Sequence, residues 1–78
     1  MLRAEFTVEP FMPGNPGPHV AAAVEAARDS GLPVEEGPFG SALVGDDAAV
    51  LAAVASLLER ALAAGATRVS IQVSQVGG

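Results

Sequence analysis

The chain contains no cysteine and only one histidine among its 78 residues. The absence of cysteine excludes disulfide bridges, thiolate nucleophiles and cysteine-ligated zinc or iron–sulfur centres. One histidine cannot form a multi-histidine metal site. We therefore expect a protein that carries no metal and no cofactor.

Lysine is also absent, and four arginines stand against nine acidic residues, which gives a formal net charge of −5. Proteins that bind the phosphate backbone of nucleic acids need a basic surface, so we expect no nucleic-acid partner. The longest apolar run, residues 48–55, is far shorter than the ~20 residues that span a bilayer. The first residues alternate instead of forming the apolar run of a signal peptide. We expect a cytoplasmic protein that has no membrane partner.

Tryptophan and tyrosine are missing, and the aromatic residues are three phenylalanines, although half of all residues are apolar. The core is therefore expected to be aliphatic and rich in alanine. A chain of this length forms one domain, residues 1–78, and buries only roughly 60% of its extended-chain surface. Association with further copies would add to so thin a core.

Strict alternation of apolar and polar residues predicts a half-buried strand over residues 2–9, "LRAEFTVE". Residues 18–31, "PHVAAAVEAARDSG", predict a helix with Pro18 in its first turn and Gly31 as a left-handed cap. The apolar stripe of this helix is formed by Val20, Ala23, Val24 and Ala27.

The next segment, residues 32–45, is expected to form two short strands that are separated by a turn at Gly37-Pro38. Residues 46–65 predict a second helix, with Asp46 or Asp47 as its N-cap and Gly65 at its end. Alternation predicts a last strand within "TRVSIQVSQV", residues 67–76. The apolar face of the second helix is formed by Val50, Val54, Leu57, Leu58 and Ala61.

The element order β-α-β-β-α-β predicts an α+β fold of the ferredoxin-like type, a four-stranded antiparallel sheet with both helices on one face. Phe6, Val8, Val69 and Ile71 are expected on the helix-covered face. The opposite, open face is expected to carry Glu5, Thr7, Ser70 and Gln72.

The loop between the first strand and the first helix is unusually long and stiff. The stretch "EPFMPGNPGPHV", residues 9–20, holds four of the six prolines and the single histidine. Ordered loops at such junctions often line binding sites. Asn15 and His19 are its candidate polar contacts, although Asn15 also suits a turn and His19 an ordinary surface position.

A second candidate stretch is "GPFGSALVGD", residues 37–46, in which Gly40 precedes Ser41. A glycine next to a strand often marks a close approach by another group, and we expect Gly40 to leave room beside the Ser41 hydroxyl. No base stands near Ser41, which argues against a serine hydrolase. The Glu35-Glu36 pair points to opposite faces of a strand and cannot act as a catalytic dyad.

These segments together resemble the thiamine-binding protein family of small YkoF-like domains. The resemblance covers about residues 3–75, and its most specific parts are "SGL" at 30–32, "PFGS" at 38–41 and "RVS" at 68–70. It implies a ferredoxin-like fold that binds thiamine (vitamin B1) or its hydroxymethylpyrimidine moiety without catalysis. Family members often carry a glutamate where this chain has Val44.

On this resemblance the pocket would lie between the proline loop and "PFGS". An aromatic pyrimidine would pack on Phe11, Met12 or Phe39, and polar contacts would come from Asn15 and Ser41. Glutamates at the rim, Glu9 or Glu36, would favour a thiazolium cation. The full set of candidate ligand-binding residues is Glu9, Phe11, Met12, Asn15, His19, Glu36, Phe39, Gly40 and Ser41.

The resemblance also implies a dimer or tetramer of the chain that is joined through the sheets. The last strand is expected at an edge, and after Arg68 it carries no charge, proline or glycine before Gly77. A different function stays open, namely a structural or regulatory homo-oligomer whose ligand is different or absent. Acylphosphatase-like catalysis is not expected, because no arginine lies between Arg3 and Arg28.

Overall fold

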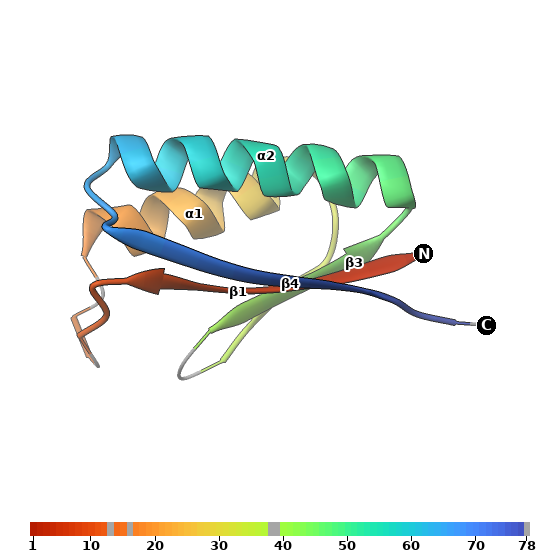
Figure 1. The fold of residues 1–78 in the computed structure, drawn as a ribbon, viewed down its shortest axis with the longest axis horizontal. Helices are drawn as coiled ribbons and strands as arrows, with labels where there is room; N and C mark the ends of the chain where they lie inside the picture. The colour runs from red at the N-terminus through yellow and green to blue at the C-terminus, as the bar shows by residue number, and fades with distance from the viewer. Residues whose placement is uncertain (13, 16, 38–39, 78) are drawn as a thin grey trace.

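The computed structural model of the chain describes residues 1–12, 14, 15, 17–37 and 40–77. It confirms the predicted order of strands and helices (Figure 1). The elements are β1 (Leu2–Glu9), α1 (Pro18–Asp29), β2 (Val34–Glu36), β3 (Ser41–Gly45), α2 (Asp47–Ala63) and β4 (Arg68–Gln75).

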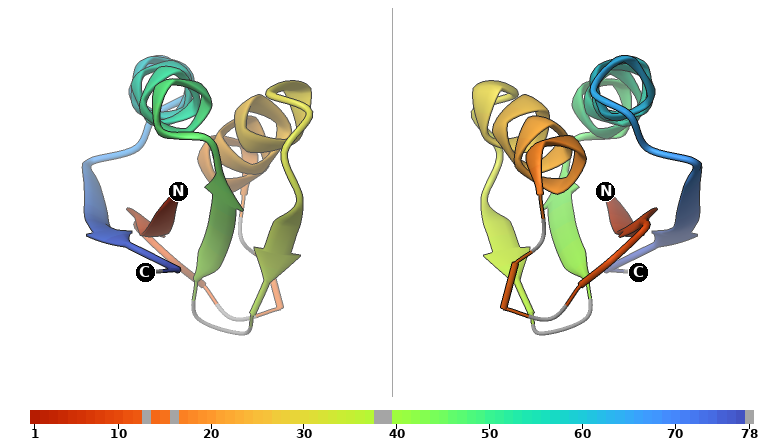
Figure 2. Two further views of the ribbon diagram at one scale, coloured as in Figure 1. Left: turned by 90° about the vertical axis from the view of Figure 1, so that its right-hand side faces the viewer. Right: turned by 90° about the vertical axis from the view of Figure 1, so that its left-hand side faces the viewer.

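The four strands form one antiparallel sheet in the order β2-β3-β1-β4, so β4 lies at an edge as predicted. Both helices cover the same face of this sheet, and the other face is open (Figure 2). The fold is therefore α+β and ferredoxin-like. Among the described residues, neither helix has the length and apolarity needed to cross a membrane.

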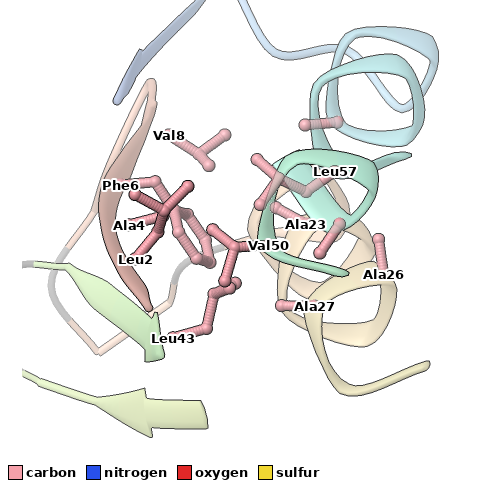
Figure 3. Packing of buried hydrophobic residues seen from close by; sticks show 12 residues of the cluster. Leu2, Ala4, Phe6, Val8, Ala23, Ala26, Ala27, Leu43, Val50 and Leu57 are labelled. Carbon is pink, nitrogen blue, oxygen red and sulfur yellow. The ribbon is translucent and has the colours of Figure 1, made fainter. Parts of the chain in front are cut away.

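The core lies between the helices and the inner face of the sheet (Figure 3). Alternate residues of β1, from Leu2 to Val8, are buried, whereas the intervening residues are exposed or half-buried. Val69 and Ile71 of β4 pack against this core but stay partly exposed. The largest side chains that are almost completely buried are Leu43, Val50 and Leu57.

The helix ends agree with the sequence in most respects. Gly31 and Gly65 follow α1 and α2 with φ of 81° and 107°, a left-handed conformation that glycine adopts without steric cost. Asp46 occupies the N-cap position of α2, but its side chain makes no capping hydrogen bond. Asp47 instead pairs with the terminal ammonium group of Met1, 3.1 Å away, so neither carboxylate caps the helix by hydrogen bonding.

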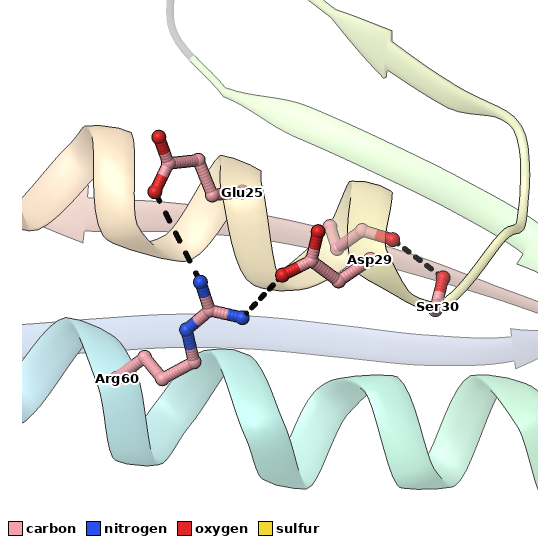
Figure 4. A network of polar contacts seen from close by, with 5 residues as sticks. Glu25, Asp29, Ser30 and Arg60 are labelled. Atoms are coloured by element: carbon pink, nitrogen blue, oxygen red, sulfur yellow. Dashed lines mark hydrogen bonds and ion pairs between the residues drawn. The ribbon is translucent and has the colours of Figure 1, made fainter.

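The two helices pack along each other through small residues. A shallow groove between them is lined mainly by alanine and serine side chains, including Ala26 on α1 and Ala53 on α2. Arg60 reaches across the interface, with a nitrogen 2.8 Å from Asp29 and another 3.9 Å from Glu25 (Figure 4). Small side chains at the contact allow a short distance between the helix axes, towards the lower end of the ~8–10 Å that packed helices show.

Candidate functional site

A pocket of about 200 Å³ opens on the helical side of the sheet, where β1 ends, α1 begins and the β2–β3 hairpin turns back. We call it the hairpin pocket. Its apolar walls are Phe6, Val8, Phe11, Val20 and Val24, and its remaining lining is Thr7, Gly14, Glu36, Gly37, Gly40 and Ser41. The described lining thus includes Phe11 and Gly14 of the proline loop together with Gly40 and Ser41, whereas Pro38 and Phe39 of "PFGS" lie outside the described residues.

Ser41 belongs to the helical side because of its register. It lies directly opposite Phe6 on the neighbouring antiparallel strand. Directly opposed residues point to the same face of a sheet, and Phe6 is buried beneath the helices. The Ser41 hydroxyl therefore emerges on the pocket side, beside the buried ring of Phe6.

Gly40 is required by the close approach of the hairpin to β1. A Cβ atom on Gly40 would lie 3.0 Å from the Phe6 carbonyl oxygen and 3.0 Å from Cγ2 of Thr7. The Gly37 N–H donates to the Gly40 carbonyl oxygen at 2.7 Å and closes the turn. The space that a side chain at Gly40 would need is therefore occupied by strand β1.

The rim carboxylates are accompanied by arginines. Glu36 lines the pocket and forms an ion pair with Arg28 of α1. Both side chains are about half exposed, 48% for Glu36 and 60% for Arg28. Glu9 does not line the pocket, and its directly opposed residue on β4 is Arg68. Each rim carboxylate that the sequence suggested as a cation site thus has an arginine beside it.

Of the loop residues that were predicted as ligand contacts, only some line the pocket. Phe11 lines it with 36% of its surface exposed, whereas Met12 is 62% exposed and outside the lining. Asn15 is also outside the lining, and its N–H donates to the Met12 carbonyl oxygen in a turn. His19 Nε2–H donates to the Pro10 carbonyl oxygen, which ties the two ends of the loop together. Phe39 lies outside the described residues.

Four residues that form apolar walls of the pocket were not predicted as site residues. These residues, Phe6, Val8, Val20 and Val24, were assigned to the core alone, because apolar periodicity marks any buried face. What distinguishes them is their place near the end of β1 and in the first half of α1, next to the long loop. The spacing of apolar residues in the sequence does not distinguish residues that are only part of the core from residues that also line a pocket.

The open face of the sheet has a wider depression of about 520 Å³, which we call the open-face trough. Its lining includes the charged residues Arg3, Glu5 and Glu35. Arg3 lies 2.9 Å from Glu5 and 3.8 Å from Glu35. The hydrogen bond to Glu5 is the main cause that raises the pKa of Arg3. Val44, directly opposed to Arg3, belongs to this face and lies outside the hairpin pocket.

Within the described parts of the chain, no group of three histidine or carboxylate side chains is placed to hold a metal ion. The described lining of the hairpin pocket combines apolar walls, the hydroxyl residues Thr7 and Ser41, and the ion-paired carboxylate of Glu36. That arrangement can hold a small planar ring and orient it by a few polar contacts.

No curated protein matches the chain in sequence. Solved structures do resemble it. A domain of unknown function from Bacillus cereus has a TM-score of 0.74 and 26% identity, over 96% of this chain and 75% of that one. A hypothetical protein from Methanocaldococcus jannascii has a TM-score of 0.70 and 24% identity, over 97% and 80% of the two chains.

A third solved structure, from Thermotoga maritima, is of a protein assigned provisionally to thiamine biosynthesis or salvage. It has a TM-score of 0.69 and 20% identity, over 94% of this chain and 78% of that one. The family model for thiamine-binding proteins matches residues 4–75. That match spans almost the whole chain, including both sides of the hairpin pocket, and the chain belongs to the thiamine-binding protein family.

Proposed function

We propose that the hairpin pocket binds the pyrimidine ring of thiamine or of hydroxymethylpyrimidine, and that the chain does so without catalysing a reaction. The observation that carries the proposal is a largely apolar slot of about 200 Å³ with the Ser41 hydroxyl group on its sheet wall. Pockets for drug-sized ligands measure roughly 300–1,000 Å³, so this slot suits one substituted ring. Membership of the thiamine-binding family supports the ligand class.

The lining offers contacts of the kind an aminopyrimidine needs. Phe11 and Val24 provide apolar surface for the faces of a flat ring. The Ser41 hydroxyl can donate a hydrogen bond to a ring nitrogen, and the Glu36 carboxylate can accept one from the exocyclic amino group. The thiazolium ring of thiamine would then lie towards the rim, near the Arg28–Glu36 pair.

Several contacts support binding without catalysis. The Ser41 hydroxyl would need a base to become a nucleophile. The histidine of the chain donates its Nε2–H to Pro10 and is not among the lining residues. Glu36 is engaged with Arg28. We therefore assign the polar groups of the pocket to orientation of the ligand.

Calorimetric titration with thiamine, its phosphates and hydroxymethylpyrimidine tests the proposal. We expect hydroxymethylpyrimidine to bind with a stoichiometry of one per chain, and Ser41→Ala to weaken it. Ser70→Ala is the matched control, because Ser70 lies on the open face and lines only the trough. Equal loss in both variants would place the ligand elsewhere, and absence of binding to every compound would refute the proposal.

A second function is favoured by one observation, the ion pairing of the rim carboxylate Glu36. A pocket whose charge is already compensated has little attraction for a free cation. If no thiamine derivative binds, the chain is better described as a structural or regulatory domain of a homo-oligomer. An unchanged melting temperature with every thiamine compound, together with a mass above one chain, would favour that function.

A further inference from the structure

Near the end of β1, the main-chain groups of one residue, Val8, differ from those of its neighbours. The carbonyl oxygen of Glu9 accepts from the Thr67 N–H at 2.8 Å and from the Thr67 hydroxyl group at 3.2 Å. The carbonyl oxygen of Pro10 accepts from the His19 ring. Buried main-chain groups are almost always paired, so a buried residue that departs from this pattern needs a physical explanation.

The phase of the ladder between β1 and β4 shows which way the main-chain groups of β1 point. The Val76 N–H donates to the Met1 carbonyl oxygen at 3.1 Å, so these two residues form a hydrogen-bonded pair. Such pairs alternate with non-hydrogen-bonded pairs along an antiparallel ladder. Odd-numbered residues of β1 therefore bond to β4, and even-numbered residues turn their N–H and C=O groups towards β3. Phe6 agrees, because its carbonyl oxygen lies 3.0 Å from the place of a Cβ on Gly40.

Val8 is an even-numbered residue that extends beyond the paired part of β3. The ladder between β1 and β3 ends at the pair of Phe6 and Ser41. The next residue, Gly40, lies outside β3, and its carbonyl oxygen accepts from the Gly37 N–H at the closing end of the hairpin. Among the described residues, neither the N–H nor the C=O group of Val8 has a hydrogen-bond partner. We call these two groups the Val8 edge.

The Val8 edge borders the hairpin pocket. Val8 is only 4% exposed, and its side chain points into the core (Figure 3). The residue lines the pocket together with Gly40 on the hairpin side. A buried donor or acceptor without a partner is costly, and a ligand that pairs with both groups removes that cost.

We propose that the Val8 edge selects the ring that the pocket binds, and that it recognises flat heterocycles in which an acceptor nitrogen stands beside an amino group. This inference rests on the proposed function and names the class of ligand that the same pocket accepts. In an antiparallel strand the N–H and C=O of one residue point the same way and present a donor next to an acceptor. The ring nitrogen and the amino group of an aminopyrimidine present the complementary acceptor and donor.

The Val8 edge adds to the side-chain contacts of the pocket and does not compete with them. An aminopyrimidine has two ring nitrogens and two amino hydrogens. The Val8 N–H donates to the ring nitrogen beside the amino group, and the Val8 carbonyl oxygen accepts one amino hydrogen. The second ring nitrogen is then left for the Ser41 hydroxyl group, and the second amino hydrogen for the Glu36 carboxylate.

The same contact explains a preference for one half of thiamine. The thiazolium ring has neither an N–H nor an amino group, so it cannot donate to the Val8 carbonyl oxygen. A site that is built to hydrogen-bond a ligand group strongly rejects an analogue that lacks the group, because buried polar atoms of the protein are then left unpaired. We expect hydroxymethylpyrimidine to bind at least about tenfold more tightly than the hydroxyethylthiazole half.

An amide-to-ester exchange tests the Val8 edge without changing a side chain. In a chemically synthesised chain, an ester oxygen in place of the Val8 N–H removes the donor and should weaken hydroxymethylpyrimidine about fivefold. The matched control is the same exchange at Val73, whose N–H points away from β1 at the outer edge of β4. Each ester also weakens one carbonyl group of the β1–β4 ladder, at Thr7 or at Gln72, so the two variants should lose similar stability. Equal loss of ligand in both esters would overturn the proposal.

Two analogues of the ligand test whether the Val8 edge meets the expected atoms. One has C–H in place of the ring nitrogen beside the amino group, and the other has methyl in place of the amino group. Both should bind the unmodified chain at least about fivefold more weakly than hydroxymethylpyrimidine. In the Val8 ester the C–H analogue should bind nearly as well as hydroxymethylpyrimidine, because both changes remove the same contact. In Ser41→Ala the difference between these two compounds should remain.

Nuclear magnetic resonance gives a direct readout in the unmodified chain. Saturation with hydroxymethylpyrimidine should shift the Val8 amide proton and slow its exchange with solvent. The Phe6 amide proton is the control, because it belongs to a hydrogen-bonded pair of the β1–β3 ladder and should change little. A Val8 amide proton with an unchanged shift in the saturated chain would overturn the proposal.

The outcomes separate this inference from the proposed function. If no thiamine compound binds the unmodified chain, both are refuted. If hydroxymethylpyrimidine binds and is weakened in Ser41→Ala but not in the Val8 ester, the pocket is the site and the Val8 edge is refuted.

Discussion

Phe6 and Ser41 are directly opposed residues on strands β1 and β3, and both side chains emerge on the helix-covered face of the sheet. The Phe6 ring is buried in the core and also forms a wall of the hairpin pocket, while the Ser41 hydroxyl group beside it lines the pocket. This one pair marks the boundary between the part of the sheet that stabilises the fold and the part that can meet a ligand.

Removal of the Ser41 hydroxyl should weaken ligand binding but not folding. One neutral hydrogen bond contributes on the order of 1 kcal/mol, so Ser41→Ala should raise the dissociation constant of hydroxymethylpyrimidine about fivefold. Calorimetry measures the affinity and a thermal melt measures the stability. An affinity equal to that of the wild-type chain would remove Ser41 from the site.

A side chain at Gly40 should separate the hairpin from β1. The new Cβ would be 3.0 Å from the Phe6 carbonyl oxygen, a main-chain atom that cannot move without strand β1. Gly40→Val should therefore lower the free energy of unfolding by roughly 1–3 kcal/mol, as over-packed sites do. Chemical denaturation measures this change, with Ser41→Ala as the neighbouring control. Loss of ligand in Gly40→Val with wild-type stability would show that the space belongs to the ligand and not to β1.

The affinity for thiamine should depend on the charges of the Arg28–Glu36 pair at the rim of the pocket. Arg28→Gln frees the carboxylate and should increase the affinity for thiamine, whose thiazolium ring is cationic. Glu36→Gln removes the carboxylate but keeps the positive charge of Arg28, and should decrease the affinity for thiamine. Both effects should shrink as salt is added, because the pair is about half exposed. Hydroxymethylpyrimidine shares the amino contact with Glu36 but has no thiazolium, so its affinity should change less than that of thiamine. An equal change for both ligands in Arg28→Gln would exclude a thiazolium at this rim.

Gly45 should be coupled energetically to Leu32. A Cβ on Gly45 would lie 2.5 Å from Cδ2 of Leu32, which packs against the core from the segment before β2. Gly45→Ala should cost roughly 1–3 kcal/mol of stability. The double variant Gly45→Ala, Leu32→Ala should lose less stability than the sum of the losses in the two single variants, because neighbouring residues are energetically coupled. Strict additivity in chemical denaturation would show that the two residues do not compete for space.

The sequence predicted the fold well because its signals are local and agree with one another. Alternation in β1 and glycine at both helix ends each specify one element, and the observed strand order follows from those elements. The predicted break at Gly37-Pro38 agrees with a β2 that ends at Glu36 and a β3 that begins at Ser41, although Pro38 itself lies outside the described residues. The capping role of Asp46 or Asp47 could not be predicted from local sequence, because a carboxylate near a helix end can pair with a group that is distant in sequence. Asp47 pairs with the terminal ammonium group of Met1.

The site was predicted only in outline. Its two halves, the proline loop and the segment before β3, were identified from composition and from the family resemblance. Which side chains of a loop turn inward depends on tertiary contacts that no local pattern records. Phe11 lines the pocket, whereas His19 donates to the Pro10 carbonyl oxygen and lies outside the lining. Glu36 lines the pocket and also pairs with Arg28.

The alanines between the two helices have an effect far from where they lie. Because Ala26 and Ala53 are small, α1 and α2 pack closely against each other. Together they cover an area that is narrower than the four-stranded sheet below them. At the margin of this cover, Val69 and Ile71 of β4 stay partly exposed and Val73 is 44% exposed. Larger residues between the helices would move the helices apart and cover more of this strand, so the volume of a few interior methyl groups sets how much apolar surface β4 leaves open to water.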